Sequence, residues 1–371
     1  MRVALVHDWL TGMRGGEKAL ERLCEIFPQA ELFTLLHVKG SVSPLIEDRP
    51  IHTAFTQHLP WVAKAYRHYL PLFPTAIERL DFRGFDLVVS CSHCVAKSVI
   101  VPAGVPHICY CLTPMRYAWD QFDAYFGPQK VGRLASAALR PVMRRMSRWD
   151  QATSGRASRY LAISQYVARR IGLYYNREST IVYPPVDTEY FTPGGVAPEA
   201  TFVIVSALVP YKRLELAIDA AHAAHLPLDI IGDGPERAGL ESLAARGPGV
   251  RLLGRLDDAA VRERYRTAAA VLLPGEEDFG IVPVEAQACG RPVVALARGG
   301  ATETVIDGVT GLLVADDTVP AWRDALTRAA TLTWPADRIR AHAERFSHDR
   351  FRTEFRAAVG EVLAAPRGQQ W

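Results

Sequence analysis

The sequence has no long hydrophobic run. None of its apolar stretches approaches the roughly twenty residues that a membrane-spanning helix needs. Its first residues, MRVALVHDWL, read as a short strand that enters a polar loop, and they lack the pattern of a signal peptide. We therefore expect a cytoplasmic protein.

Familiar nucleotide-binding motifs are also missing. No glycine-rich loop is followed by Gly-Lys-Ser or Gly-Lys-Thr, which excludes a Walker loop. The segment GDGP has Arg237 where the dinucleotide fingerprint needs its third glycine, which disfavours a dehydrogenase. There is no Asp-x-Asp, a motif with which single-sheet nucleotide-sugar enzymes commonly hold a divalent ion. We therefore expect no metal and no other cofactor.

The sequence contains few cysteines and carries little net charge. Cys91 and Cys94 form a C-x-x-C that would suit zinc, but Cys109 and Cys111 alternate within a predicted strand. Free thiols are the favoured interpretation of all six cysteines. The net charge of +3 is too small to indicate nucleic-acid binding.

What the sequence does have is alternation of strands and helices over 371 residues, enough for two domains. The fold class expected is α/β, with two doubly wound parallel sheets, each Rossmann-like, that face each other across a cleft. The adjacent prolines Pro184 and Pro185 stiffen the exit from a strand. This predicts a first domain over residues 1–184 and a second over residues 185–346.

The stretch from Pro274 to Ala295 predicts a binding site. It reads as strand, acidic turn, a short helix that starts near Gly280, and strand. Glu277 lies in the turn and Glu285 faces inward from the helix, so both carboxylates border the unpaired N–H groups of the helix start. Phosphate would bind those amides and sugar hydroxyls would bind the carboxylates. The alternative is an acidic turn that only caps the helix.

Basic and glycine-rich turns supply further candidates. Lys212 and Arg213 lie between a core strand and its helix, where they would neutralise a diphosphate, or else are ordinary surface cations. Gly15 and Gly16 open a helix and form either a binding loop or a tight turn. Gly232 and Gly234 end a strand that points toward the same cleft.

Polar and aromatic residues follow the strands of the first half, where open α/β sheets bind ligands. We take five of them as candidates for binding a second substrate, and call them the acceptor-side candidates: Asp8, Trp9, Arg116, Tyr117 and Trp119.

A basic amphipathic helix is predicted over residues 129–149, with Pro141 breaking or kinking it. It is either a core-facing helix with a solvated basic face or an interfacial helix that meets anionic lipid. The membrane candidates are Arg140, Arg144 and Arg145.

Taken together, these motifs resemble the GT4 family of retaining glycosyltransferases with the GT-B fold. The resemblance covers nearly the whole chain. It rests on Glu277 to Glu285 in EDFGIVPVEA, Lys212 in PYK, the glycine pair in MRGGEK, the strand end GDGP and the linker YPPVDTEYF. TPMRYAWD and LVPYKR look like the branch of bacterial O-antigen and exopolysaccharide mannosyltransferases. The family also implies that residues 347–371 form a helix that crosses back onto the first domain.

The resemblance implies roles for individual residues. Glu285 would hold the donor ribose, Glu277 the sugar hydroxyls and Lys212 the phosphates, while the glycine pair would close over the donor. The loop and helix-start residues expected to contact the donor are Asp278, Phe279, Gly280, Ile281 and Val282.

The chain departs from the family pattern at two positions. Ala207 replaces an arginine that shares phosphate neutralisation, for which Arg213 is a candidate substitute. Leu112 replaces a histidine before TPMRY, with His107 or Arg116 as candidates for the nearby space.

The predicted activity is therefore metal-independent, retaining transfer of a hexose from a nucleotide diphosphosugar to a glycan or polyprenyl-linked acceptor in surface polysaccharide synthesis. GDP-mannose is the expected donor. A peripheral position at the inner face of the plasma membrane follows if the basic helix binds lipid. The alternatives are a catalytically silent sugar-nucleotide- or lipid-binding scaffold and a GT-B epimerase or phosphorylase.

Overall fold

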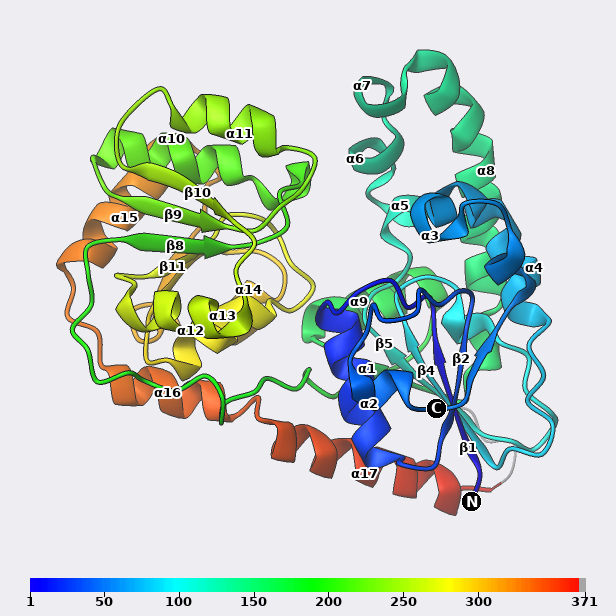
Figure 1. Ribbon diagram of the computed structural model, residues 1–371. Coiled ribbons are helices and arrows are strands. Elements are labelled where there is room, and N and C mark those ends of the chain that lie inside the picture. Colours follow the sequence, from blue (N-terminus) through cyan, green and yellow to red (C-terminus); the bar gives the residue numbers. More distant parts are fainter. Residues whose placement is uncertain (367–371) are drawn as a thin grey trace. The chain divides into compact units, whose positions relative to one another are not determined.

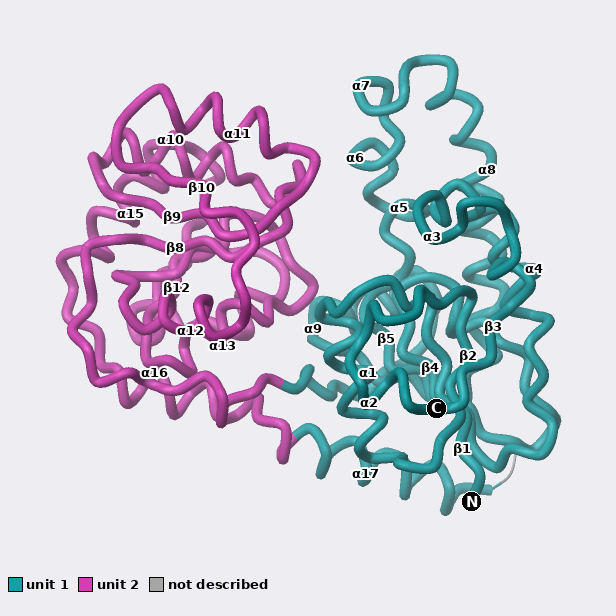
Figure 2. Tube along the Cα trace, in the orientation of Figure 1, with its two compact units in different colours: residues 1–185, 351–371 teal, residues 186–350 magenta. Residues whose placement is uncertain are grey.

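The structure is a computed structural model that describes residues 1–366 of the 371 in the chain. The chain divides into two compact units, shown in Figure 2. The first contains residues 1–185 and the chain from Phe351 onward, and the second contains Val186–Arg350. The last five residues of the segment predicted as a C-terminal helix, 367–371, lie outside the described residues.

The first unit is built on a seven-stranded parallel sheet with the strand order β3-β2-β1-β4-β5-β6-β7. The central strands are mostly apolar and are buried along their whole length, as expected for a sheet covered on both faces. The strands are β1 (Val3–His7), β2 (Glu31–Thr34), β3 (Ile51–Thr53), β4 (Leu87–Ser92), β5 (His107–Cys111), β6 (Arg159–Ala162) and β7 (Thr180–Ile181).

In the sheet of the first unit, successive strands are added on one side from β1 to β3 and on the other side from β4 to β7. The connections that leave β1 and β4 therefore go opposite ways, which makes this pair the switch point of the sheet. The longer helices around this sheet are α1 (Gly15–Ile26), α8 (Arg133–Ala152), α9 (Gln165–Tyr175) and α17 (His348–Ala364). The shorter ones are α2 (Pro44–Glu47), α3 (Val62–Ala65), α4 (Phe73–Glu78), α5 (Arg116–Trp119), α6 (Phe122–Phe126) and α7 (Pro128–Val131).

The basic helix differs from its prediction. Instead of one helix from residue 129 that is interrupted at Pro141, the chain forms α7, turns at Gly132 with φ +84°, and continues as α8 through Pro141 to Ala152. The break falls at glycine because only glycine readily adopts positive φ. Pro141 is tolerated because Ala137, whose carbonyl loses its helical partner, is exposed to water. Among residues 1–366, no helix combines the length and hydropathy needed to cross a bilayer.

The second unit repeats the architecture with a six-stranded parallel sheet, ordered β10-β9-β8-β11-β12-β13. The strands are β8 (Phe202–Val205), β9 (Leu228–Ile231), β10 (Val250–Gly254), β11 (Val271–Leu273), β12 (Val293–Leu296) and β13 (Gly311–Val314). The helices α10 and α11 lie on one side of this sheet and α12 and α13 on the other (Figure 1). The helices are α10 (Leu214–Ala224), α11 (Arg237–Ala244), α12 (Asp258–Thr267), α13 (Ile281–Ala288), α14 (Ala301–Thr304), α15 (Val319–Thr331) and α16 (Ala336–Glu344). The prediction of two doubly wound α/β units is confirmed.

The C-terminal helix α17 is part of the first unit's core. The ring of Phe355, fully buried, lies edge-on to Phe27 and Tyr110 at centroid distances of 6.3 and 5.9 Å. Arg159 of β6 forms an ion pair with Glu361 at 2.7 Å. The helix therefore covers apolar surface that the first unit would otherwise expose.

We predict that Phe355→Ala destabilises the protein by about 3–5 kcal/mol, because it leaves a cavity among the surrounding rings. Urea denaturation followed by circular dichroism measures the change. Arg356→Ala, on the exposed side of the same helix, is the control and should change stability by less than about 0.5 kcal/mol. Equal stability of the two variants would contradict a packing role for α17.

Candidate functional site

The candidate site of the second unit lies where β8 and β11 pair, through Val203 and Val271. This pair is the switch point of the sheet, the position where open α/β sheets bind ligands. After β8 the chain reaches the short 3-10 helix η5 (Pro210–Lys212), which carries Lys212. After β11 it enters the acidic turn that holds Glu277. Because the two strands are parallel, Lys212 and Glu277 come to the same end of the sheet, the carboxyl end.

Glycines let the loops at the ends of β8, β11 and β12 touch. A Cβ atom on Gly275 would lie 2.6 Å from the carbonyl oxygen of Tyr211 and 2.7 Å from Cα of Lys212. A Cβ on Gly300 would lie 2.3 Å from Cα of Phe279. Only glycine fits at these distances. Neither glycine was predicted to matter, although the place of Gly275 between a buried strand and an acidic turn signals close backbone approach.

Lys212 and Glu277 form an ion pair. Their side chains are 16% and 18% exposed, so the pair is partly shielded from water yet still reachable by a ligand. Each group is suited to a different part of one ligand. The ammonium can bind phosphate oxygens, and the carboxylate can accept hydrogen bonds from hydroxyls.

The helix after the acidic turn begins as predicted. Gly280 has φ +90° and is followed by α13, whose first residues, Ile281 and Val282, are partly exposed. Their backbone N–H groups lie in the first turn, where a helix has no internal acceptors. Asp278 and Phe279 are buried, and Phe279 packs edge-on against Phe346 at 5.5 Å.

Glu285 is buried and faces inward. Its Oε2 accepts a hydrogen bond of 3.1 Å from the hydroxyl of Tyr265. Burial, followed by the nearby carboxylate of Glu285, raises the pKa of Tyr265 well above its usual value, so the phenol keeps its proton. Tyr265 therefore orients Glu285, a role that no motif in the sequence indicated.

The strand end GDGP has a demonstrable packing role. A Cβ on Gly232 would lie 1.8 Å from the carbonyl oxygen of Ser206, and one on Gly234 would lie 2.4 Å from that of Leu208. Both glycines hold the end of β9 against the loop after β8. Any contact that they make with a donor stays a prediction.

Arg213 is engaged with acids of its own unit. It has φ +53° and forms ion pairs of 3.0 Å with Glu215 and 3.1 Å with Asp317. Arg213 and then Arg298 lower the pKa of Asp317 below its ordinary value. Ala207 is exposed and adds no charge. Arg298, which follows β12, is a second cation beside Asp317, at 3.7 Å, and it was not among the predicted site residues.

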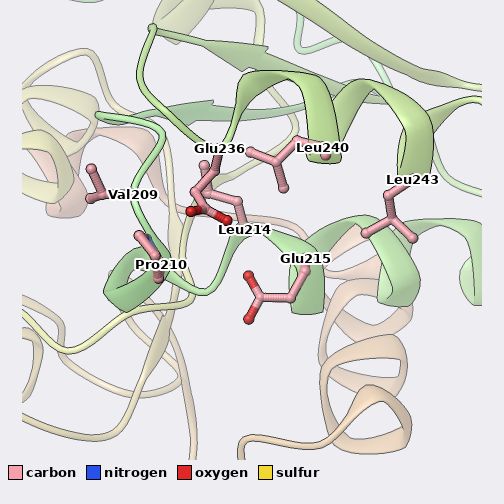
Figure 3. Close-up of a pocket in the computed structure, with 8 residues that line it drawn as sticks. Val209, Pro210, Leu214, Glu215, Glu236, Leu240 and Leu243 are labelled. Carbon is pink, nitrogen blue, oxygen red and sulfur yellow. The ribbon is translucent and has the colours of Figure 1, made fainter. Parts of the chain in front are cut away.

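A cavity of about 240 Å³ lies beside this edge, between α10 and α11 (Figure 3). Its lining is apolar apart from two carboxylates, and includes Val209, Pro210, Leu240, Glu215 and Glu236. It contains no cation and its carboxylates would repel a diphosphate. We therefore assign the candidate site to Lys212, Glu277 and the start of α13.

In the first unit, Gly15 and Gly16 form the start of α1, as predicted. A Cβ on Gly16 would lie 3.0 Å from Cδ1 of Leu112 and 3.5 Å from Cε1 of His7. The helix start is thus packed closely over the ends of β1 and β5. Burial disfavours a charge on His7, but Cys91 and Glu17 raise its pKa well above the usual value.

Two acceptor-side candidates have a different role from the one expected. Asp8 is fully buried, and its oxygens accept four backbone hydrogen bonds from the turn after β4. Trp9 is 8% exposed and packs on Tyr66 and Phe73. Neither side chain offers a free surface to an acceptor, because one satisfies backbone donors and the other fills the core.

The remaining acceptor-side candidates lie on α5 and are partly exposed. The hydroxyl of Tyr117 lies 2.7 Å from Sγ of Cys94. Trp119 donates to Asp150 at 2.8 Å and stacks on Tyr174 at 4.6 Å. Arg116 shares the helix with them. These contacts hold both rings in place, and any contact with an acceptor stays a prediction.

His107 does not occupy the space near Leu112. His107 is the first residue of β5, whereas Leu112 follows the last, so the two residues lie at opposite ends of that strand. His107 is buried, with Nε2 2.8 Å from Oγ of Ser90. Burial lowers its pKa to about 4. All six cysteines are buried free thiols, as predicted.

The three membrane candidates are exposed on α8. Arg140 forms an ion pair with Asp123 at 2.7 Å and lies over the ring of Phe122. Arg144 and Arg145 follow one turn later on the same helix. Their exposure is compatible with a solvated basic face and with an interfacial helix alike.

Two family models together match most of the chain. The model described as glycosyltransferase family 4 matches residues 15–190, and that described as glycosyl transferases group 1 matches residues 188–346. The curated relatives include D-inositol 3-phosphate glycosyltransferases of Actinosynnema mirum, Kribbella flavida and Geodermatophilus obscurus. They are 34%, 36% and 32% identical over 63%, 47% and 63% of this chain. The aligned parts span only 64%, 49% and 61% of those relatives' lengths.

Solved structures share the fold. The Anabaena protein HepE in complex with UDP has a TM-score of 0.70 and 19% identity, over 97% of this chain and 100% of that one. The lipopolysaccharide outer core galactosyltransferase WaaB in its apo form has a TM-score of 0.69 and 16% identity, over 97% and 99%. At these identities the similarity establishes the architecture alone.

Proposed function

The chain belongs to glycosyltransferase family 4, and we propose that it transfers a hexose from a nucleotide diphosphosugar to a hydroxyl acceptor with retention at the anomeric carbon. The observation that carries the proposal is the Lys212–Glu277 pair at the switch point of the second sheet. A cation for phosphate and an acceptor for hydroxyls lie together beside a helix start. A sugar joined to a diphosphate has both matching groups.

Each residue then has a chemical task. Lys212 and the first N–H groups of α13 neutralise the diphosphate, whose charge grows as it leaves. Glu277 hydrogen-bonds the sugar, and Glu285 the ribose. The new bond forms between the anomeric carbon and the acceptor oxygen, the bond to the diphosphate breaks, and the departing phosphate takes the acceptor proton. The reaction as proposed needs no metal.

Phosphate neutralisation depends heavily on Lys212 in this chain. Ala207 supplies no charge, and Arg213 is held by Glu215 and Asp317. An anion would have to compete with two carboxylates for the guanidinium of Arg213. Lys212 forms its ion pair with Glu277, the residue proposed to bind the sugar, so both charges would engage the same ligand.

GDP-mannose is our proposed donor, on the resemblance of TPMRYAWD and LVPYKR to mannosyltransferases. HepE has been solved with UDP and with UDP-glucose, which makes uridine nucleotides the competing choice. For the acceptor we propose a glycan or polyprenyl-linked oligosaccharide of surface polysaccharide synthesis. The names of the curated relatives make an inositol phosphate the competing acceptor.

We also propose that the protein works in the cytoplasm and rests on anionic membrane through α8. The exposed arginines of this helix supply charge complementarity to such a surface. A lipid-linked acceptor would then be presented at the surface where the enzyme binds.

Nucleotide binding should be selective for diphosphates. We expect GDP and GDP-mannose to raise the melting temperature more than UDP, ADP or their sugar conjugates, because a ligand of the native state stabilises it. At a concentration a hundredfold above Kd the gain is about 2.7 kcal/mol. GMP, which lacks the second phosphate, serves as the matched control. A larger shift with UDP would overturn the choice of base, and no shift with any nucleotide would overturn the donor site.

Lys212→Ala should lower turnover of the nucleotide sugar by roughly 100-fold and change its KM much less, since the lost charge acts mainly on the transition state. Release of nucleoside diphosphate measures both constants. Lys39→Ala, at an exposed position, is the control. If turnover stays intact and only KM rises, the role assigned to Lys212 is wrong.

Replacing Arg140, Arg144 and Arg145 together with glutamine should reduce binding to vesicles of phosphatidylglycerol and phosphatidylcholine. Each cation near an anionic surface contributes about 1 kcal/mol, so the loss is roughly 100-fold. Flotation measures the bound fraction. The control replaces three exposed arginines of the second unit, Arg323, Arg328 and Arg338. Equal flotation of both triple variants would exclude α8 as the membrane contact.

A further inference from the structure

Two long segments of the first unit contain no acidic residue. One spans residues 49–77 and the other residues 124–149. The first includes Lys64, Arg67 and three histidines, and the second contains α7 and α8 with their lysine and arginine side chains. Because no carboxylate offsets these cations within either segment, both would attract an anionic surface.

The two segments pack on each other. Trp149, the last residue of the second segment, donates a hydrogen bond of 3.0 Å to Glu78, which directly follows the first. Both segments also contribute to one hydrophobic core. The buried residues that they share in this core are Val62, Tyr66, Leu70, Phe73, Met143 and Met146. The segments therefore form one part of the unit, which we call the basic lobe.

The basic lobe exposes large apolar side chains. Among residues 1–366, the two most exposed large hydrophobic side chains are Leu134, at 89%, and Trp61, at 85%. Each lies in a different one of the two acid-free segments. A single exposed leucine is ordinary at a protein surface, but tryptophan is on average a highly buried residue. The exposure of Trp61 is therefore the more informative of the two.

The backbone around Trp61 is ordered, although the ring is exposed. Trp61 has φ +49°, which is uncommon for a bulky residue. Its carbonyl accepts the N–H groups of Lys64 and Ala65, both at 2.9 Å. The hydroxyl of Tyr69 donates to the carbonyl of Pro60 at 2.8 Å. These bonds hold the start of α3 in place, so the ring is presented to solvent from a fixed position.

Cations accompany Trp61 on the exposed side of this helical stretch, which continues from α3 into the 3-10 helix η2 (Tyr66–Leu72). Lys64 and His68 follow Trp61 by three and seven residues, about one and two helical turns, and both are exposed. Arg67 is exposed as well. An aromatic ring among cations suits a lipid interface, where the ring enters the acyl boundary and the cations stay among the headgroups.

We propose that Trp61 is the apolar anchor of the basic lobe, the side chain that inserts into an anionic lipid bilayer. The inference rests on the proposed membrane contact of α8 and adds a second step to it, because the arginines of α8 attract the surface and Trp61 enters it. An anionic bilayer offers both headgroup charge over a wide area and an apolar layer beneath that charge. Salt screens the attraction between charges but not the burial of the ring.

The test measures flotation of the full chain with vesicles of phosphatidylglycerol and phosphatidylcholine, at about 0.15 M and about 1 M salt. At each salt concentration the lipid is raised until half of the wild type floats. We expect Trp61→Ala to weaken binding roughly tenfold at both salt concentrations, because the ring's burial is lost. The loss caused by replacing Arg140, Arg144 and Arg145 with glutamine should disappear at the higher one. Leu173→Ala, at a position 73% exposed on α9, is the matched control and should bind like wild type.

A second variant reports insertion directly. Trp61→Tyr keeps an amphipathic ring and should bind within about threefold of wild type. Lipids with brominated acyl chains quench tryptophans that reach the acyl region. With both proteins bound, these lipids should quench the wild type more than Trp61→Tyr. Equal quenching would overturn the anchor.

The variants separate this inference from the proposed function. If the triple glutamine variant loses binding at about 0.15 M salt and Trp61→Ala does not, α8 remains the membrane contact and the anchor is wrong. If only Trp61→Ala loses binding, the anchor stands and the role of the α8 arginines fails. If neither loses binding, both fail. A Trp61→Ala protein that floats like wild type but sediments as a monomer, where the wild type is a dimer, would assign this surface to a second copy of the chain and overturn the anchor.

Discussion

The site of the second unit depends on the parallel pairing of β8 with β11. This contact brings two loops together that are separated by more than sixty residues of chain, the one with Lys212 and the one with Glu277. Neither charge would be useful alone, since an isolated buried ammonium or carboxylate is costly. Together they neutralise each other without ligand, and a ligand with phosphates and hydroxyls can replace each partner. Gly275 makes the approach possible because any side chain there would collide with Lys212.

In the first unit, the parallel pair β1–β4 likewise brings polar residues together at the carboxyl ends of its strands. There the carboxylate is Asp8, whose oxygens accept four backbone hydrogen bonds, so it organises the turn after β4 instead of meeting a ligand. The glycine pair at the start of α1 packs over these strand ends. Two sheets of equivalent strand order thus have switch points with different chemistry, one with a lysine–glutamate pair and one with a histidine–aspartate pair.

Much of the fold could be predicted because its signals are local. Continuous apolar runs such as Val3–His7 mark buried parallel strands, and Gly280 and Gly290 bracket a short helix by adopting positive φ. The basic helix was predicted less well. Proline was expected to interrupt it, yet the break falls at Gly132, because an exposed proline leaves a carbonyl that water can satisfy.

By itself, the sequence determined the α/β class, the doubly wound order and the residue types that gather at the strand ends, since each follows from periodicity and from motifs within a few residues. Only the tertiary structure decided which of those residues meet. It paired Arg213 with Asp317 and placed Tyr265 on Glu285. It also set His93 beside Asp8. Such contacts depend on strand register between segments far apart in the chain, and no local pattern encodes that register.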